Sequence, residues 1–422
     1  MPLRFSGLWR HAPFVTLWVG ESISLFGSQV SLLALQLTAI QSLHADAAQL
    51  GILGATGSVP MVLISVFVGV WVDRLPRRRL LLIADVGQAL LIGSVPVMFS
   101  LGWLCLEYLY GVALLTGCFS VLFGIAYQSF LPELVPPEQL VEGNSKLEAS
   151  RAIAEIAGPS IAGTIVQVVS APFALLVDAV SFLVSALCLK SIRLPMATPA
   201  PLLKQPSFWE QCAEGFHVIR KHALLRAIVC CSSTLNFGGA IILTVFTFYM
   251  INELHLSAAV CGIILGGGSL GSLAGAMLAA PLARWYGWGP TLLGTTLCWS
   301  MGALLLPLAH GPIMLTILLL LAGRFVMGTA QTTYNINQIS LRQITLPGAL
   351  HGRINATIRC LAGSAVPLGS FLGGGLGTLI GVRGTLLFGA ISLSLSSCWL
   401  FFSPVRYVQK RRKATSVDPS RS

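Results

Sequence analysis

The residues Gly69–Arg79 decide the fold, and they read Gly-Val-Trp-Val-Asp-Arg-Leu-Pro-Arg-Arg-Arg. One acid and four arginines stand together here, while an apolar run ends just before them and another begins at Leu80. Because charged side chains are costly inside a bilayer, a cluster this compact must lie on one side of a membrane. The stretch therefore predicts two membrane-spanning helices joined by a short charged loop.

The composition of the whole chain agrees with a membrane protein. Of 422 residues, 55% are hydrophobic and only 10% are charged, and the mean hydropathy is +0.81. Soluble domains carry about 25% charged residues, so a soluble fold is excluded. The net charge of +11 would suggest nucleic acid as the partner of a soluble protein. Here the charges flank apolar runs, so the expected surroundings are a lipid bilayer and no nucleic-acid partner.

The ten cysteines are scattered through apolar runs without a CxxC pair or a histidine spacing suited to a metal. They are interpreted as small hydrophobic side chains, and neither a metal nor another cofactor is expected. The first apolar run begins near Ala12 and lacks a convincing signal-peptide cleavage site. It is therefore predicted to be the first permanent span.

Twelve apolar segments are long enough for membrane-spanning helices of about 20 residues. An all-α membrane protein follows, because open sheets cannot satisfy their backbone in lipid. The expected spans are 13–39, 48–72, 80–100, 104–130, 147–169, 172–190, 227–251, 259–283, 290–309, 312–338, 354–380 and 384–403.

Lysine and arginine are concentrated in alternate loops, which predicts the orientation. If the N-terminus lies inside, the outer loops contain essentially one basic residue, Arg383. Both termini are therefore expected in the cytoplasm, with the protein in the bacterial plasma (inner) membrane as a multi-pass protein.

The chain divides into two related halves. We expect a six-helix half at 1–190, a linker at 191–226, a second six-helix half at 227–403 and a basic cytoplasmic tail at 404–422. Within the linker, Phe208–Arg226 has the apolar spacing of an interfacial amphipathic helix. At an offset of 211 residues, part of the second span recurs in the eighth, which indicates duplication of a six-helix unit. The recurring residues are Ala47, Gly51 and Gly57, which return as Ala258, Gly262 and Gly268.

With twelve spans, two related halves and this charged loop, the chain resembles the major facilitator superfamily. The loop signature of that family is Gly-x-x-x-Asp-Arg-x-Gly-Arg-Arg/Lys, and Pro76 replaces its second glycine. The resemblance implies a twelve-helix fold in which this loop is a cytoplasmic gate, its aspartate facing the start of the eleventh helix near Arg353–Asn355. The matching residues are Gly69, Asp73, Arg74, Arg77 and Arg78.

The fifth span carries a second motif, Ala-Glu-Ile-Ala-Gly-Pro-Ser-Ile-Ala-Gly at Ala154–Gly163. It is similar to the motif of the superfamily's antiporters, which it matches at Gly158, Pro159 and Gly163. An ordinary kinked packing helix is the alternative. The segments 128–145 and 335–355 resemble the branch that contains macrolide efflux proteins and enterobactin exporters. These resemblances imply export, driven by protons.

Glu21 in the first span stands on a polar strip with Ser24 and Ser28, and Gln29 lies on an adjoining strip. The strip predicts contact with a water-filled cavity. A carboxyl group in such a place can exchange protons or bind a cation. A structural polar contact is the alternative.

Arg324 in the tenth span begins a second polar strip, which continues through Gln331 and Asn335. A mid-membrane arginine keeps its charge, so Arg324 is expected either to pair with a cavity acid such as Glu21 or to hold an acidic group of the cargo. The seventh span adds a milder strip with Asn236 and Thr244. Since the fourth span is nearly apolar, the cavity suits amphipathic cargo.

Three further acids lie within spans. Glu155, inside the antiporter-like motif, is expected either to carry a proton or to pair with Arg151. Asp85 is expected to pair with the arginine cluster of the charged loop. Asp178 is interpreted as a hydrogen bond between helices.

The favoured function is a secondary transporter that exports small amphipathic molecules by proton antiport and alternating access. The cargo would be a drug-like compound, a siderophore or another secondary metabolite, with protons as the coupling partner and a monomer as the working expectation. An importer or facilitator and a non-transporting membrane sensor are the alternatives. No enzyme is expected, because the chain lacks a nucleophile–base pair, an HExxH motif and a Walker loop.

Overall fold

A computed structural model describes residues 7–64, 68, 71–72, 75–136, 139–192, 216–217, 219–345 and 351–407. Every regular element in these ranges is helical. The long helices are α1 (Ala12–Leu37), α2 (Ala47–Leu63), α4 (Arg77–Ser100), α5 (Leu106–Leu134), α6 (Leu140–Val169), α7 (Ala171–Ser191), α9 (Ala223–Phe248), α10 (Ala258–Tyr286), α11 (Trp288–Leu308), α12 (Ile313–Thr345), α13 (His351–Leu379) and α14 (Gly381–Phe401).

These helices follow the predicted spans. Eleven of them, within the described ranges, are long and apolar enough to cross a membrane. The twelfth, α2, has 17 residues as described, and positions 68, 71 and 72 beyond it are also helical. Residues 208–215 and 218 of the predicted amphipathic linker helix lie outside the described residues, while 216–217 and 219–221 are helical. The helix α9 begins at Ala223, inside the predicted linker.

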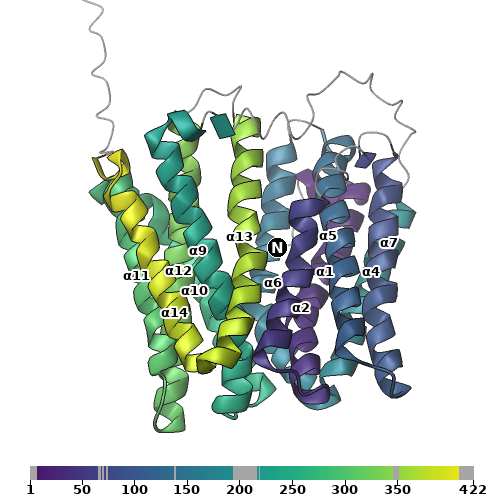
Figure 1. The fold of residues 1–422 in the computed structure, drawn as a ribbon. Coiled ribbons are helices and arrows are strands. Elements are labelled where there is room, and N and C mark those ends of the chain that lie inside the picture. The colour runs from purple at the N-terminus through teal and green to yellow at the C-terminus, as the bar shows by residue number, and fades with distance from the viewer. Residues whose placement is uncertain are drawn as a thin grey trace, which may run out of the picture.

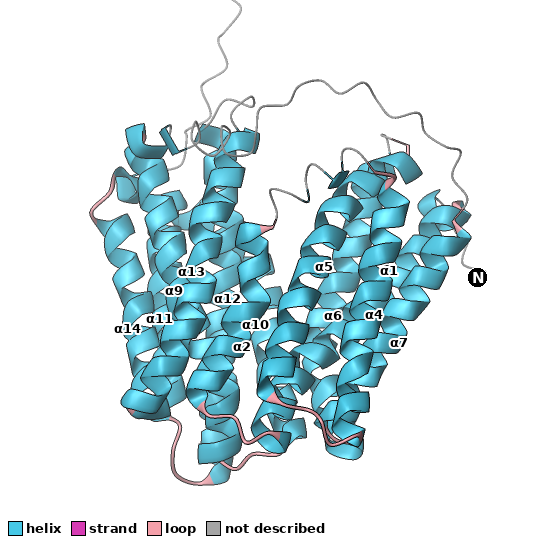
Figure 2. Ribbon diagram, turned by 45° about the vertical axis from the view of Figure 1, so that its right-hand side comes forward, coloured by secondary structure: helices cyan, strands magenta, loops and turns pink. Residues whose placement is uncertain are grey.

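The helices form two bundles, one from α1 to α7 and the other from α9 to α14 (Figure 1). They meet where α2 packs against α13 and α6 packs against α10. Figure 2 shows the two bundles side by side, with the ribbons of the two bundles closer together toward the lower end. We call the opposite end, where α1 and α9 begin and α7 and α14 finish, the basic end. It carries Arg77, Arg78, Lys190, Arg226 and Arg284.

The duplication is visible in the turns away from the basic end. A π-turn, Thr38–Ser42, ends α1, and another, Tyr249–Glu253, ends α9. In each turn a histidine then takes a left-handed backbone, with φ 53° at His44 and φ 51° at His255. All these positions are related by the offset of 211 residues. The offset seen in the sequence therefore relates equivalent backbone conformations.

Candidate functional site

The contact between α6 and α10 is made by backbone against backbone. A Cβ atom added at Gly163 would collide with the carbonyl oxygen of Ala258, and one added at Gly262 would collide with that of Pro159. Both approaches are closer than the 3.0 Å that real Cβ atoms keep. Two residues of the antiporter-like motif, Pro159 and Gly163, therefore lie at the junction of the two bundles.

The contact between α2 and α13 repeats this arrangement. A Cβ atom at Gly374 would lie 2.7 Å from the carbonyl oxygen of Ala47, and one at Gly51 would lie 2.7 Å from that of Ser370. Because α2 and α10 begin at the end opposite the basic end, both contacts hold the bundles together at this opposite end. We call Gly51, Gly163, Gly262 and Gly374 the glycine seal.

A hydrogen bond between the bundles lies near the seal. The Thr247 hydroxyl donates to Oε1 of Gln36 at 2.7 Å. These two residues are themselves related by the offset of 211, so the pseudo-two-fold axis of the molecule passes close to their bond. Glycine and polar contacts together close this end of the interface.

A polar pocket of about 210 Å³ lies between α2, α9, α11, α12 and α13, and we call it the α12 pocket. It brings together three residues of the predicted polar strips, Asn236, Gln331 and Asn335. Its other lining residues are Met61, Ser232, Leu235, Trp299, Tyr334, Gln338, Ile358, Ala362 and Gly363. Since Met61 comes from the first bundle, the pocket is completed by both halves.

Two polar atoms of residues that line the α12 pocket lack hydrogen-bond partners. They are Nε1 of Trp299, a donor, and Oε1 of Gln338, an acceptor, and both are buried. Other lining groups are paired internally: the hydroxyl groups of Ser232 and Tyr334 lie 3.0 Å apart, and Nδ2 of Asn236 donates to the carbonyl oxygen of Ala362. An unpaired buried donor and acceptor cost free energy, so these atoms favour a ligand with polar groups. Trp299 and Tyr334 were missed because aromatic residues within apolar runs read as core.

Arg324 lies on α12, about two turns from Gln331. Its Nε atom has no hydrogen-bond partner, and its guanidinium carbon lies 5.8 Å from the ring centroid of Phe246. No ion pair among the described residues involves Arg324, so the predicted pairing with Glu21 is absent from this conformation. Thr244, also predicted to line the cavity, is buried on α9 near Gly54 of α2.

Two buried acids occupy the first bundle. Glu21 on α1 is 8% exposed and its Oε2 atom has no partner, while Asp85 on α4 is fully buried with both oxygens unpartnered.

The prediction that Asp85 pairs with the arginine cluster is wrong at both described arginines of the motif. Arg77 pairs with Glu133, and Arg78 donates to the carbonyl groups of Leu189 and Lys190 at the end of α7. Carbonyl groups at a helix end lack internal partners and attract cations, which explains why Arg78 binds the end of α7 rather than Asp85.

The polar strip of α1 divides between two neighbouring helices. Ser24 is buried, and the Ser28 hydroxyl donates to Oδ1 of Asp178 on α7 at 3.5 Å. Asp178 also accepts from Ser181 of its own helix at 3.1 Å. The bond from Ser28 of α1 confirms the predicted role of Asp178 as a hydrogen bond between helices. Gln29 instead packs beside Gly158 of α6. Only part of the strip therefore remains near Glu21.

Glu155 is exposed on α6. Its predicted partner Arg151 lies 3.9 Å from Glu148 instead, and no ion pair in the described part of the chain includes Glu155. The salt-bridge alternative for Glu155 is thus not observed.

Part of the charged-loop motif lies outside the described residues, namely Gly69, Asp73 and Arg74. The side chains of Arg353 and Asn355, at the start of α13, are likewise not described. The predicted contact between Asp73 and α13 therefore stays a prediction.

The sequence profile of the Major Facilitator Superfamily matches residues 17–367 and, in a second alignment, 228–421. The chain belongs to this superfamily. It is accordingly a transporter, and with its eleven candidate spans and bacterial relatives it is a multi-pass protein of the bacterial inner membrane.

Several relatives are named as efflux proteins. The chain is 28% identical to the multidrug efflux pump Tap of Mycolicibacterium fortuitum over 379 residues, which cover 87% of this chain and 90% of the relative. It is 23% identical to macrolide efflux protein A of Streptococcus pyogenes over 217 residues, covering 51% and 53% of the two chains.

Solved structures share the fold at low sequence identity. The nucleoside transporter NupG superposes with a TM-score of 0.75 at 15% identity, covering 92% of this chain and 98% of that one. A bacterial homologue of the iron transporter ferroportin, in an inward-facing state, superposes with a TM-score of 0.73 at 17% identity, covering 94% and 99%. These similarities establish the twelve-helix architecture.

Proposed function

We propose that this transporter exports small amphipathic molecules by proton antiport. The observation that carries the proposal is the α12 pocket, which both halves complete and which holds an unpaired donor and acceptor. The glycine seal closes the interface at one end. In alternating access, this seal opens as the other end closes, so that cargo in the pocket crosses the membrane.

The direction of transport is inferred from the relatives and from the antiporter-like motif. The basic end faces the cytoplasm by the positive-inside rule, so the described conformation would exchange cargo with the cytoplasm. The relatives named as efflux proteins, and the position of Pro159 and Gly163 at the seal, support export.

The chemistry of the cargo follows from the pocket and Arg324. Amide and hydroxyl groups line the pocket, and Met61, Leu235 and Ile358 supply apolar surface. Such a lining suits a molecule with apolar surface and a few hydrogen-bonding groups. Arg324, which has no acid partner among the described residues, favours cargo with an acidic or strongly accepting group.

Glu21 is proposed as the proton carrier. A buried carboxyl group without a cationic partner is more stable as the neutral acid, and it loses its proton when water reaches it. Glu21 is the buried acid of the predicted α1 strip, and a change in access between the two ends would alternately protonate and deprotonate it.

The test is a proton-gradient assay in everted membrane vesicles of a pump-deficient bacterium. We expect addition of an amphipathic macrolide or dye to dissipate the acidic interior when the wild-type chain is present. Glu21→Gln should abolish this dissipation but retain exchange of the compound between the two sides. Glu148→Gln, at an exposed acid of α6, is the matched control and should behave as wild type.

Three outcomes would contradict the proposal. Gradient dissipation that survives Glu21→Gln would remove the proposed role of Glu21. Higher accumulation of the compound in intact cells would indicate import. An unchanged distribution of every compound, in cells and in vesicles, would favour a sensor.

A further inference from the structure

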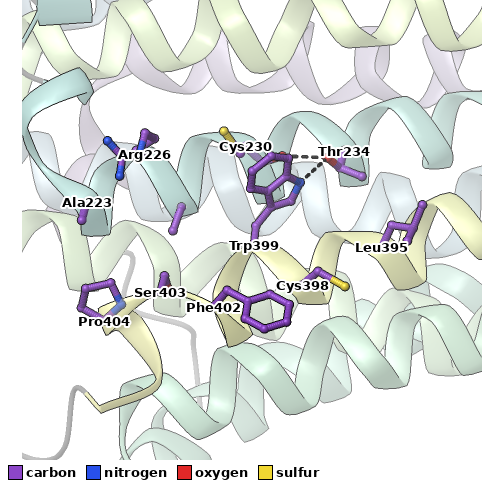
Figure 3. Close-up of a pocket in the computed structure, with 11 residues that line it drawn as sticks. Ala223, Arg226, Cys230, Thr234, Leu395, Cys398, Trp399, Phe402, Ser403 and Pro404 are labelled. Atoms are coloured by element: carbon purple, nitrogen blue, oxygen red, sulfur yellow. Dashed lines mark hydrogen bonds between the residues drawn. The ribbon is translucent and has the colours of Figure 1, made fainter.

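A second and larger pocket lies on the side of α9 that faces away from the α12 pocket. It has a volume of about 660 Å³ and runs between α9 and α14 (Figure 3). Ser232 and Asn236 of α9 line the α12 pocket, whereas Cys230 and Thr234 line this second pocket. We call it the α9–α14 groove. Its other lining residues are Ala223, Arg226, Ala227, Leu395, Cys398, Trp399, Phe402, Ser403 and Pro404.

The groove is open to the surroundings of the bundle. Trp399 is 50% exposed and Phe402 is 83% exposed, although both lie within or beside a membrane-spanning helix. Nε1 of Trp399 donates to the Thr234 hydroxyl at 3.1 Å, which fixes the indole ring as one wall (Figure 3). Its volume lies within the range of about 300–1,000 Å³ that is usual for ligand pockets. In a bilayer, an apolar groove of this kind is filled by lipid.

The charge at one end of the groove defines the lipid. Arg226 lies at the basic end, in the first turn of α9, and its side chain is exposed. Its Nη1 atom donates to the carbonyl oxygen of Arg220 at 3.2 Å, and no ion pair within the described ranges includes it. A positive charge at the membrane surface beside an apolar groove complements an anionic headgroup that continues into an acyl chain.

We propose that the α9–α14 groove is a binding site for an anionic phospholipid. Its phosphate is held by Arg226, and one acyl chain lies along Trp399, Cys398 and Leu395. This inference concerns the outer face of α9 and does not depend on the direction of transport or on the cargo.

The first half of the molecule lacks this site. At the offset of 211, Arg226, Thr234 and Trp399 correspond to Val15, Ile23 and Cys188. There α1 and α7 approach closely, since a Cβ atom at Gly20 would lie 2.9 Å from Cβ of Cys188. The charge, the hydroxyl and the indole are therefore not repeated at the equivalent described positions of the first half, which favours a specific site over general contact with lipid.

The test measures lipid binding to the purified full-length protein in detergent by native mass spectrometry. We expect one phosphatidylglycerol molecule to bind wild type more tightly than phosphatidylcholine does. Arg226→Gln should weaken the binding of phosphatidylglycerol by about fivefold. This change corresponds to the ~1 kcal/mol that one basic residue contributes at an anionic membrane surface. Arg226→Lys should retain most of the affinity. Cys398→Trp, which fills the groove, should displace the lipid while leaving the charge.

The control is Arg284→Gln, at an exposed arginine on the basic end of α10 in the same half. It should bind phosphatidylglycerol as wild type does. The proposal is overturned if Arg284→Gln and Arg226→Gln weaken binding equally, or if phosphatidylcholine binds as tightly as phosphatidylglycerol. It is also overturned if glycerol phosphate competes fully, because the site would then hold a free anion rather than a lipid. If Arg226→Gln does not fold, Arg226→Lys and Cys398→Trp decide the question alone.

Discussion

The two halves of this transporter keep the same contacts where they touch and differ where they hold charge. In the seal, Gly163 against Ala258 in one half corresponds to Gly374 against Ala47 in the other. Away from the seal the equivalent positions diverge. Glu21 corresponds to Ser232, Asp178 to Gly389, and Arg324 to Ala113.

One pair of helix crossings shows the divergence directly. In the first half, Gly27 of α1 packs against Ser181 and Asp178 of α7. In the second half, Gly238 of α9 packs against Gly389 of α14, where an added Cβ atom would lie 3.0 Å from the carbonyl oxygen. The helix crossing is therefore preserved, but the buried Asp178 of the first half is replaced by Gly389, which has no side chain, in the second. The two halves thus share the same helix crossings. They differ in their internal charged residues, which are acids in the first half and include Arg324 in the second.

The largest effect is expected at the seal. Gly163→Ala and Gly374→Ala each place a methyl group against a backbone carbonyl that cannot move alone, and such overpacking costs about 1–3 kcal/mol. We expect transport to fall by roughly tenfold or more in both variants, because the closed end no longer closes. The measurement is transport rate together with thiol labelling of a cysteine placed near Gln36.

The control for the seal is Gly239→Ala on α9, where an added Cβ atom meets nothing within 4 Å. It should transport normally. If only one of the two seal variants loses activity, the α6–α10 and α2–α13 contacts are equivalent in structure but not in function.

The next largest effect is expected at Arg324 in the second half. Arg324→Gln removes a charge that has no acid partner in the described part of the chain. A hydrogen bond to a charged group contributes about 1.5–3 kcal/mol, so transport of an acidic cargo should fall by roughly tenfold or more. A neutral analogue of the same cargo should be affected little. Equal losses for both compounds would assign Arg324 to helix packing.

A smaller effect is expected in the α12 pocket. Trp299→Phe keeps an aromatic ring but removes the unpaired Nε1 donor. If cargo accepts from this atom, KM should rise by about fivefold, since one neutral hydrogen bond contributes about 1 kcal/mol. Trp285→Phe, at an exposed tryptophan of α10, is the matched control. An unchanged KM in Trp299→Phe would exclude this donor from cargo binding.

The smallest effect is expected at the end that holds the seal. Arg383 pairs with Glu253 at 3.2 Å, and the first half has Pro172 in its place. Both side chains are partly exposed, so Arg383→Gln should change the free energy of unfolding by less than about 1 kcal/mol. Thermal unfolding in detergent measures this change. A loss of several kcal/mol would show that this half depends on a charge that the other half does without.

The helices could be predicted because each span is a continuous apolar run, and hydropathy over about 20 residues is a strong signal. Helical spacing predicted polar strips through Asn236, Gln331 and Asn335, and these residues line the α12 pocket. The environment of Asp85 did not follow, because spacing along one helix does not reveal which neighbour covers it. The α9–α14 groove was invisible for a related reason, since Trp399 and Phe402 read as ordinary apolar residues of a span.

The glycine seal has a consequence for speed as well as for fit. A contact of leucine side chains would have to exchange rotamers and release interlocked groups each time it opened. Backbone surfaces such as Gly51 against Gly374 carry no side chains to disentangle, so they separate and return as rigid bodies. Opening this end therefore requires these surfaces to part and the polar links that cross it to break, among them the bond from Thr247 to Gln36.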